Sequence, residues 1–258
     1  MQRLGRLAEG TPLAPELALP GRCWLLSAPL DLYSHWRGSG LATQAAAGRR
    51  IELLPPPPGP AATAAARPGG RLRVRLLEDG YRGWVELQAL LGRAWACLPP
   101  PARLPDGRAI AAAMPAVLAF AEAARQRPNH YLWGGTLGPD YDCSGFIQSA
   151  FAAAGIWIPR DAYQQERFCQ SVAVAPGQYA LLRPGDLIFF GRPQRCTHVG
   201  LYLGGGRYVH SSGREHGRNG IGIDGLDPQL QDPVSTHYRR ELRGAGRVMR
   251  CHDGSTLP

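Results

Sequence analysis

Apolar and polar residues partly alternate in several short runs between residues 20 and 92. Four runs rich in β-forming residues lie at Cys23–Leu26, Arg49–Leu54, Leu72–Leu77 and Tyr81–Leu87. A period of two over such short runs predicts β-strands. The pair Asp79-Gly80, between the last two runs, is typical of a tight hairpin turn. The N-terminal region is therefore predicted to be all-β.

The apolar pattern takes a helical period in the second half of the chain. From Phe146 onward, apolar residues recur on one face of a helix that we predict over Cys143–Ala154. A helix is also predicted over Pro115–Arg127, because proline favours the first helical position and a second proline follows the segment. Ala162–Phe168 has helical character as well.

Short strands follow these helices and complete the predicted fold. They are expected at Asp186–Phe190, His198–Leu203, Arg207–His210, Ile221–Asp224 and Arg247–Arg250. Helices followed by a run of antiparallel strands predict an α+β domain.

Two proline-rich stretches interrupt the chain. Leu98–Gly107 separates the two regions, so we predict one domain over residues 1–97, with its core at about 20–92, and a second over 98–258. Pro55–Gly70 is interpreted as a long loop between strands of the first domain, and its role is left open.

Composition and charge narrow the possible partners. Hydrophobic residues make up 44% of the 258 residues and charged residues 19%, which suits a globular protein with a core. The formal net charge is +9, but the arginines are spread along the chain. Such a distribution is typical of a solvated surface, and we expect no nucleic-acid partner.

The N-terminus and the cysteines bear on the compartment. The first residues contain no apolar core of a signal peptide, and the apolar run 109–121 contains Pro115 and is short for a membrane span. We therefore expect a cytoplasmic location without membrane insertion. The six cysteines show no disulfide framework and no zinc-ligand spacing, so neither a metal nor a cofactor is expected.

Cys143 is the first candidate for chemistry. It opens the predicted helix and is followed by Ser144 and Gly145. The partial positive charge and free N–H groups of a helix N-terminus favour a thiolate, which is the nucleophilic form of cysteine. A single cysteine in a helix is nevertheless more often a small buried apolar residue. The interpretation therefore depends on a partner.

Two histidines supply candidate partners. His198 begins one predicted strand, His210 ends the next, and a glycine-rich turn joins the strands. Pairing across this hairpin brings the two rings close together. Either histidine alone suits an ordinary polar strand position, but together they provide a base for Cys143 and a group that orients the base.

Three segments carry a family resemblance. YDCSG (residues 141–145), HVGLYLG (198–204) and VHSSG (209–213) resemble, in this order, the motifs of the NlpC/p60 family of papain-like cysteine peptidases. The first motif departs slightly from the LDCSG expected in that family. The resemblance covers about residues 110–251, and it implies a papain-like α+β fold for the C-terminal domain.

The same resemblance implies roles for individual residues. Cys143 would be the nucleophile, His198 the general base and acid, and His210 the third, orienting residue. Tyr131 would lie beside the nucleophile with its hydroxyl available to the oxyanion. Two further residues, Asp142 and Ser144, flank the nucleophile and would contact the substrate.

The N-terminal region has a resemblance of its own. EDGYRGWV (residues 78–85) and the strands around it resemble a bacterial SH3-like barrel. The two domains together resemble the γ-D-glutamyl-L-diamino acid endopeptidases, which require a free N-terminal L-Ala on the substrate. This implies that Asp161, in IPRDAYQQ, contacts the substrate amine, although Ala162 stands where serine is expected. Asp161 also precedes a helical segment, so helix capping remains an equal alternative.

The predicted activity is hydrolysis of the γ-D-glutamyl–L-diamino acid bond of cell-wall (murein) peptides. The expected substrates are L-Ala-γ-D-Glu-diaminopimelate turnover peptides, and the expected role is murein recycling in the cytoplasm. The preferred diamino acid is not predicted. An acyltransferase on the same fold and a non-catalytic cell-wall-binding protein remain as alternatives.

Overall fold

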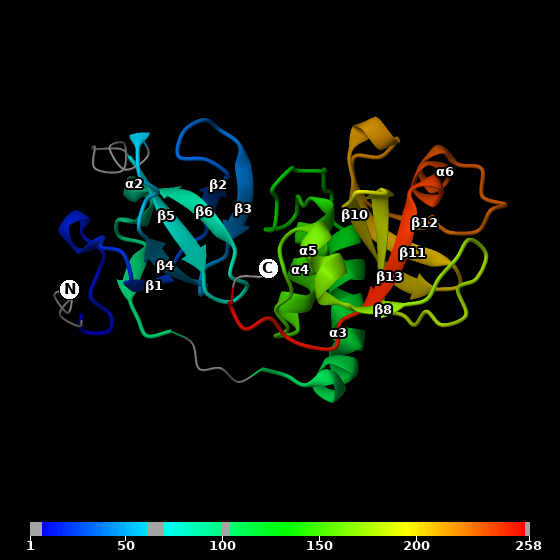
Figure 1. Cartoon of the computed structure of the whole chain (residues 1–258), viewed down its shortest axis with the longest axis horizontal. Helices are drawn as coiled ribbons and strands as arrows, with labels where there is room; N and C mark the ends of the chain where they lie inside the picture. Colours follow the sequence, from blue (N-terminus) through cyan, green and yellow to red (C-terminus); the bar gives the residue numbers. More distant parts are fainter. Residues whose placement is uncertain (1–6, 61–69, 100–103, 256–258) are drawn as a thin grey trace. The chain divides into compact units, whose positions relative to one another are not determined.

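The computed structural model of the chain describes residues 7–60, 70–99 and 104–255 (Figure 1). The described residues form two compact units, one from residues before 103 together with 253–255, and one from residues 104–252. The division falls a few residues after the predicted boundary between 97 and 98. Residues 253–255, which we assigned to the second domain, belong to the first unit. Most of the predicted loop Pro55–Gly70 lies outside the described residues.

The first unit is built on an antiparallel seven-stranded sheet. The strand order is β3-β2-β6-β5-β4-β1-β7. The strands are β1 (Cys23–Leu26), β2 (Leu30–Tyr33), β3 (Leu41–Ala45), β4 (Arg50–Leu54), β5 (Arg71–Leu76), β6 (Arg82–Glu86) and β7 (Ala94–Ala96), with short helices η1 (Pro15–Leu17) and α2 (Leu87–Leu90). The four predicted strands are present as β1, β4, β5 and β6, whereas β2, β3 and β7 were not individually predicted.

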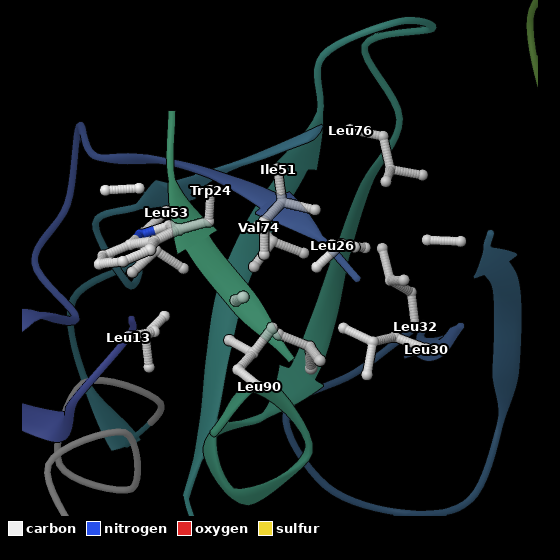
Figure 2. Packing of buried hydrophobic residues seen from close by; sticks show 14 residues of the cluster. Leu13, Trp24, Leu26, Leu30, Leu32, Ile51, Leu53, Val74, Leu76 and Leu90 are labelled. Carbon is white, nitrogen blue, oxygen red and sulfur yellow. The ribbon is translucent and has the colours of Figure 1, made fainter. Parts of the chain in front are cut away.

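Alternation along the strands separates the core of this unit from its surface. In β5 the inward positions Val74 and Leu76 are fully buried, while Arg73 and Arg75, which alternate with them, stay partly exposed. One of these, Arg75, lies opposite Glu52 of β4 and forms an ion pair with it at 2.6 Å. Figure 2 shows the buried side chains that form this core: Leu13, Trp24, Leu26, Leu30, Leu32, Ala45, Ile51, Leu53, Val74, Leu76, Val85, Leu90, Ala94 and Ala96.

The predicted hairpin turn joins β5 to β6. Gly80 has a φ of +70°, which glycine adopts without steric cost, and the N–H of Tyr81 donates to Oδ1 of Asp79 at 3.1 Å. These local interactions explain why the Asp79-Gly80 pair was sufficient to predict the turn.

The second unit combines a six-stranded antiparallel sheet with helices. The strand order is β12-β11-β10-β9-β13-β8. The strands are β8 (Gln170–Val172), β9 (Leu187–Arg192), β10 (Arg195–Gly204), β11 (Arg207–Ser212), β12 (Gly220–Gly225) and β13 (Leu242–Arg247). The helices are α3 (Gly107–Arg125), α4 (Cys143–Ala153), α5 (Ala162–Phe168), η2 (Arg214–His216) and α6 (Pro233–Arg240).

The helices of this unit pack against different strands. Helix α4 contacts β10 and β11, and α3 packs against α4, as the green helices of Figure 1 show. Helix α6 contacts β9 and β12. Its Tyr238 is buried between the rings of Phe190 and His210, at centroid distances of 5.3 and 5.0 Å. The candidate catalytic residues therefore lie where α4 and α6 meet the sheet.

Two of the three predicted helices have the predicted starts. Helices α4 and α5 begin at Cys143 and Ala162 as predicted, but the predicted start of the first helix at Pro115 is wrong. That helix, α3, begins at Gly107, because the carboxylate of Asp106 accepts hydrogen bonds from the N–H groups of Arg108 and Ala109 at 3.0 and 2.9 Å. Pro115 lies inside the helix.

Helix α3 bears on the predicted absence of membrane insertion. It has 19 residues and a mean hydropathy of 1.3, so by length and composition alone it is apolar enough to cross a membrane. Helices of soluble proteins pass the same test, and Ile110, Val117 and Ala121 of α3 are buried. The absence of membrane insertion stays a prediction.

The last predicted strand is misplaced. We expected a strand over Arg247–Arg250, but β13 covers Leu242–Arg247 and ends where the prediction begins. Two glycines weaken the intrinsic β preference of LRGAGR. The segment is nevertheless a strand because it lies between β9 and β8 and pairs with both.

Candidate active site

Cys143 is the first residue of α4. Asp142 is the N-cap, and its Oδ1 accepts from the N–H of Gly145 at 2.7 Å, which fixes the first turn of the helix. The backbone N–H groups of Ser144 and Val199 donate to the thiol sulfur. Since Val199 directly follows His198, the thiol and the predicted base belong to the same site.

A glycine-rich loop lies directly on this first turn. A Cβ at Gly145 would overlap the carbonyl oxygen of Gly135, so only glycine permits this approach. The N–H of Gly134 donates to Oδ2 of Asp142 at 2.9 Å and ties the loop to the N-cap. The predicted oxyanion residue Tyr131 is at the start of the loop. Tyr131 pairs with Tyr141, two residues before Cys143, through an isolated β-bridge. Burial raises the pKa of the Tyr131 hydroxyl, and a negative charge on Cys143 acts in the same direction.

A buried ion pair is formed by Asp142, the residue before the predicted nucleophile. Arg160 is 2% exposed and donates to the two carboxylate oxygens of Asp142 at 3.1 and 2.6 Å. It also donates to the hydroxyl of Ser144 at 2.9 Å. The side chains of Asp142 and Ser144 thus bind protein groups in this structure, and their predicted contact with substrate stays a prediction. Sequence reasoning did not assign a role to Arg160.

Two histidines and an aspartate form a hydrogen-bonded chain. Nε2 of His198 lies 2.6 Å from Nδ1 of His210, and Nε2 of His210 lies 2.6 Å from Oδ2 of Asp224. The register of β10 and β11 pairs Leu201 with Val209, so the histidines are diagonal neighbours across the hairpin. The structure therefore brings together the two predicted histidines. The carboxylate of Asp224 was not predicted.

Two further residues support this series of hydrogen bonds. Arg218 donates through one nitrogen to the two oxygens of Asp224, at 2.6 and 2.7 Å. Tyr238 of α6 stacks on the ring of His198 with a centroid distance of 4.2 Å and an interplanar angle of 23°. Its hydroxyl bonds to that of Ser212 at 2.7 Å. Sequence reasoning missed both Arg218 and Tyr238.

Burial sets the protonation of the predicted nucleophile and the predicted base. It raises the pKa of the Cys143 thiol to about 12, and the charge of Asp142 adds to this effect, while Arg160 and the surrounding N–H groups oppose it. Burial also lowers the pKa of His198 well below 6.5, and the neighbouring histidines act in the same direction. Both directions favour a thiol and a neutral imidazole at rest. The N–H of Ser144, in the first turn of α4, lowers the thiol pKa in the expected direction, but burial outweighs it.

Asp161 is the N-cap residue of α5. It forms a capping box with Gln164, whose side chain accepts from the N–H of Asp161 at 3.4 Å. This geometry supports the capping role that was one of the two alternatives. Asp161 remains partly exposed, and the predicted contact of its carboxylate with a substrate amine stays a prediction.

The other cysteines and histidines were weighed as metal ligands. Among the residues that the structure describes, no group of three or more His, Cys, Asp or Glu side chains could hold a metal ion. Cys196 donates to the carbonyl oxygen of His198 at 3.3 Å, and Cys251 accepts from the N–H of Trp157 at 3.2 Å. All six cysteines are free thiols.

Comparison with known families agrees with this geometry. Residues 128–241 match the NlpC/P60 family, and residues 32–90 match the bacterial dipeptidyl-peptidase SH3 domain. The first match contains Cys143, His198 and His210 and confirms the predicted resemblance. Together with the two sheets, the matches confirm an α+β peptidase-type domain preceded by an SH3-like, strand-rich region.

Curated relatives match parts of the chain. A γ-D-glutamyl-L-lysine dipeptidyl-peptidase of Bacillus subtilis is 44% identical over 84 residues, which is 31% of this chain and 27% of that protein. A bifunctional muramidase/DL-endopeptidase of the same organism is 35% identical over 132 residues, which is 49% of this chain and 35% of that protein. The chain thus spans about a third or less of the length of these relatives. The solved structure of an NlpC/P60 family protein from Bacillus cereus is 24% identical and has a TM-score of 0.44, over 89% of this chain and 64% of that chain.

Proposed function

We propose that this chain, whose residues 128–241 belong to the NlpC/P60 family of cysteine peptidases, hydrolyses the γ-D-glutamyl–L-diamino acid bond of murein peptides. The observation that carries the proposal is the placement of Cys143 at the start of α4 beside the chain His198–His210–Asp224. The name of the dipeptidyl-peptidase relative and the SH3 domain match support the choice of bond.

Acylation begins at the thiol. The sulfur of Cys143 attacks the γ-carbonyl carbon of D-Glu, and its proton passes to the neutral imidazole of His198. The negative charge that develops on the carbonyl oxygen is bound by N–H groups at the start of α4 and by the hydroxyl of Tyr131. His198 then gives the proton to the nitrogen of the leaving diamino acid, the C–N bond breaks, and a thioester remains on Cys143.

Deacylation repeats the proton transfers with water. His198 takes a proton from a water molecule, whose oxygen attacks the thioester carbon. The C–S bond breaks, the proton returns to the sulfur of Cys143, and the dipeptide L-Ala-D-Glu leaves. One histidine serves as base and acid in both halves of the reaction. This requires an imidazole that is neutral at rest, as burial provides for His198.

The substrate carries a free N-terminal L-Ala in this proposal. A buried or half-buried ammonium group needs a carboxylate partner, and Asp161 offers one at the start of α5. Its neighbour Arg160 is fixed by Asp142, so the position of Asp161 relative to the nucleophile is defined within one domain. Turnover peptides have this free amine, whereas the intact wall does not. The proposed role is accordingly murein recycling.

A cytoplasmic location is part of the same proposal. The six free thiols suit a reducing compartment. Cell fractionation with an antibody to the chain tests this point: enrichment in the soluble cytoplasmic fraction supports it, and enrichment in the wall or membrane fraction contradicts it.

The experiment for the activity uses purified protein and two peptides. L-Ala-γ-D-Glu-diaminopimelate and its N-acetylated form are incubated separately, and mass spectrometry measures the release of L-Ala-D-Glu or its acetylated form. Cleavage of the free peptide alone is the expected result. Equal cleavage of both peptides contradicts the free-amine requirement and the recycling role. Cleavage of neither contradicts the proposed activity, and product that appears only with an added amine acceptor indicates an acyltransferase.

A further inference from the structure

The hydrogen-bonded chain behind His198 contains more members than a nucleophile, a base and an orienting residue. It continues from His210 to Asp224 and from Asp224 to Arg218, with distances of 2.6 Å at each link. All four side chains come from one sheet and the loop before β12, and the first three are buried. Each distance requires one proton between the two atoms, so the protons along the chain depend on one another.

Asp224 determines which atom donates and which accepts in each of these hydrogen bonds. An ionised carboxylate only accepts hydrogen bonds. Burial alone would raise the pKa of Asp224, but the hydrogen bond from His210 and the charge of Arg218 hold this pKa below its usual value. Asp224 is therefore a pure acceptor, and Nε2 of His210 must carry the proton between them.

The ionised carboxylate also determines which nitrogen carries the proton in His210 and in His198. Burial lowers the pKa of His210, so its ring is neutral and Nδ1 has a free lone pair once Nε2 is protonated. The bond of 2.6 Å to His198 then requires the proton on Nε2 of His198. In a neutral His198 this leaves Nδ1 without a proton, and Nδ1 is the remaining nitrogen that can serve Cys143.

A glycine leaves space for the side chain of Arg218. The register of β11 and β12 places Gly222 opposite His210 and two residues before Asp224, on the same face of the sheet. A Cβ at Gly222 would overlap the guanidinium of Arg218. The missing side chain therefore allows Arg218 to lie across β12 and reach the carboxylate.

We propose that Asp224, kept ionised by Arg218, is a positioning residue that fixes the tautomers of His210 and His198 and leaves Nδ1 of His198 free to accept the proton of Cys143. The link to catalysis rests on the proposed function, whereas the tautomers are a property of the folded protein. An amide in place of the carboxylate would donate to Nε2 of His210, reverse both tautomers, and put a proton on the nitrogen that must act as base.

The test compares Asp224→Asn with Asp186→Asn in the full chain. Asp186 is a matched control, because it is 1% exposed and binds Arg247 through two hydrogen bonds of 2.7 and 2.8 Å outside the chain of histidines. Long-range ¹H–¹⁵N spectra of labelled protein report which nitrogen of each neutral imidazole carries the proton, and comparison with His198→Gln assigns the His198 signals. Cleavage of L-Ala-γ-D-Glu-diaminopimelate gives kcat and kcat/KM for each protein.

The expected result is a proton on Nε2 of His198 in the wild type and in Asp186→Asn, and on Nδ1 in Asp224→Asn. Asp224→Asn should lose about 10⁴-fold in kcat, the order seen when the same change is made in a Ser-His-Asp triad. Arg218→Gln and Gly222→Ala should move the acidic limit of kcat/KM to higher pH, because an unsupported Asp224 gains a proton more readily.

Three results would overturn the inference: a wild-type His198 protonated on Nδ1, an unchanged His198 tautomer in Asp224→Asn, or the same tautomer change in Asp186→Asn. Failure of the proposed function looks different. If the wild type shows the expected tautomers and cleaves no murein peptide, the positioning role of Asp224 stands and the proposed substrate is wrong.

Discussion

The phenol ring of Tyr238 lies almost parallel to the imidazole of His198, with their centroids 4.2 Å apart. Tyr238 comes from α6, whereas His198 lies on β10. A helix that follows the strands in sequence therefore fixes the plane of the proposed base. The hydroxyl of Tyr238 is held by Ser212 and lies 3.5 Å from Nδ1 of His198. The stack therefore controls the orientation of the ring around the bond to His210.

This relationship predicts different effects of two substitutions at Tyr238. Tyr238→Phe keeps the stacked ring and should retain most of the activity. Tyr238→Leu fills much of the space but leaves the imidazole free to rotate, so kcat should fall while KM changes little. Steady-state kinetics on the murein tripeptide measure both constants. Equal activity of the two variants would mean that the stack does not position His198.

The ion pair between Arg160 and Asp142 is predicted to be a structural requirement of the site. Arg160→Met leaves the carboxylate of Asp142 buried without its charged partner, and loss of one member of a buried pair costs about 3–5 kcal/mol of unfolding free energy. Urea unfolding followed by circular dichroism measures the change. Arg125→Met is the control, because Arg125 pairs with an exposed Glu122 on α3, and its urea midpoint should not move. A similar midpoint for wild type and Arg160→Met would contradict the prediction.

Acid is predicted to destabilise the fold through the buried histidines. Burial lowers the pKa values of His198 and His210 below 6.5 in the folded chain. Above this pH neither state binds the extra protons, and stability does not depend on these groups. As the pH falls below 6.5, the unfolded chain binds protons that the folded chain excludes, so stability falls.

Urea midpoints measured from pH 8 to pH 5 test this dependence. These limits lie about 1.5 units on either side of the ordinary histidine pKa, which applies to the unfolded chain. His210→Asn removes one of the buried groups and should make the dependence shallower. His130→Gln, which removes an exposed imidazole (69% accessible), is the control variant for the loss of a histidine. A wild-type slope in His210→Asn would show that His210 does not contribute to it.

The hydroxyl of Tyr131 is predicted to act in the transition state. Tyr131→Phe keeps the ring and removes the hydroxyl that we propose as a donor to the developing oxyanion. Loss of one such donor lowers kcat by about 10²- to 10³-fold with little change in KM. Tyr179→Phe is the control, because the hydroxyl of Tyr179 bonds to the carbonyl oxygen of Leu226, away from the site. An unchanged kcat for Tyr131→Phe would remove the hydroxyl from the mechanism.

Sequence patterns predicted the elements whose limits are set locally. Helices α4 and α5 start at Cys143 and Ala162 because the residue before each, Asp142 or Asp161, caps the helix. The same principle explains the error in α3. The predicted start was placed at Pro115, but Asp106 caps the helix, so α3 begins at Gly107, eight residues earlier. Asp106 lies at the end of a proline-rich stretch that has no apolar period.

Residues that depend on strand register could not be found in this way. Asp224 follows His210 by fourteen positions, and only the pairing of His210 with Gly222 shows that Asp224 lies on the same face. Tyr238 belongs to a helix that the apolar pattern did not reveal. The order Cys143, His198, His210 was readable because the three residues stand in short motifs, whereas their supporting partners are distributed over the fold.

The central claim is that Cys143 is the nucleophile of a peptide hydrolysis. It is tested most directly by cleavage of L-Ala-γ-D-Glu-diaminopimelate with wild type, Cys143→Ala and Cys169→Ala, followed by mass spectrometry of L-Ala-D-Glu. Cys169 is a suitable control, since burial raises its pKa to about 12, as it does for Cys143. The account predicts release of the dipeptide by wild type and Cys169→Ala and none by Cys143→Ala. Release by Cys143→Ala at the wild-type rate would contradict it.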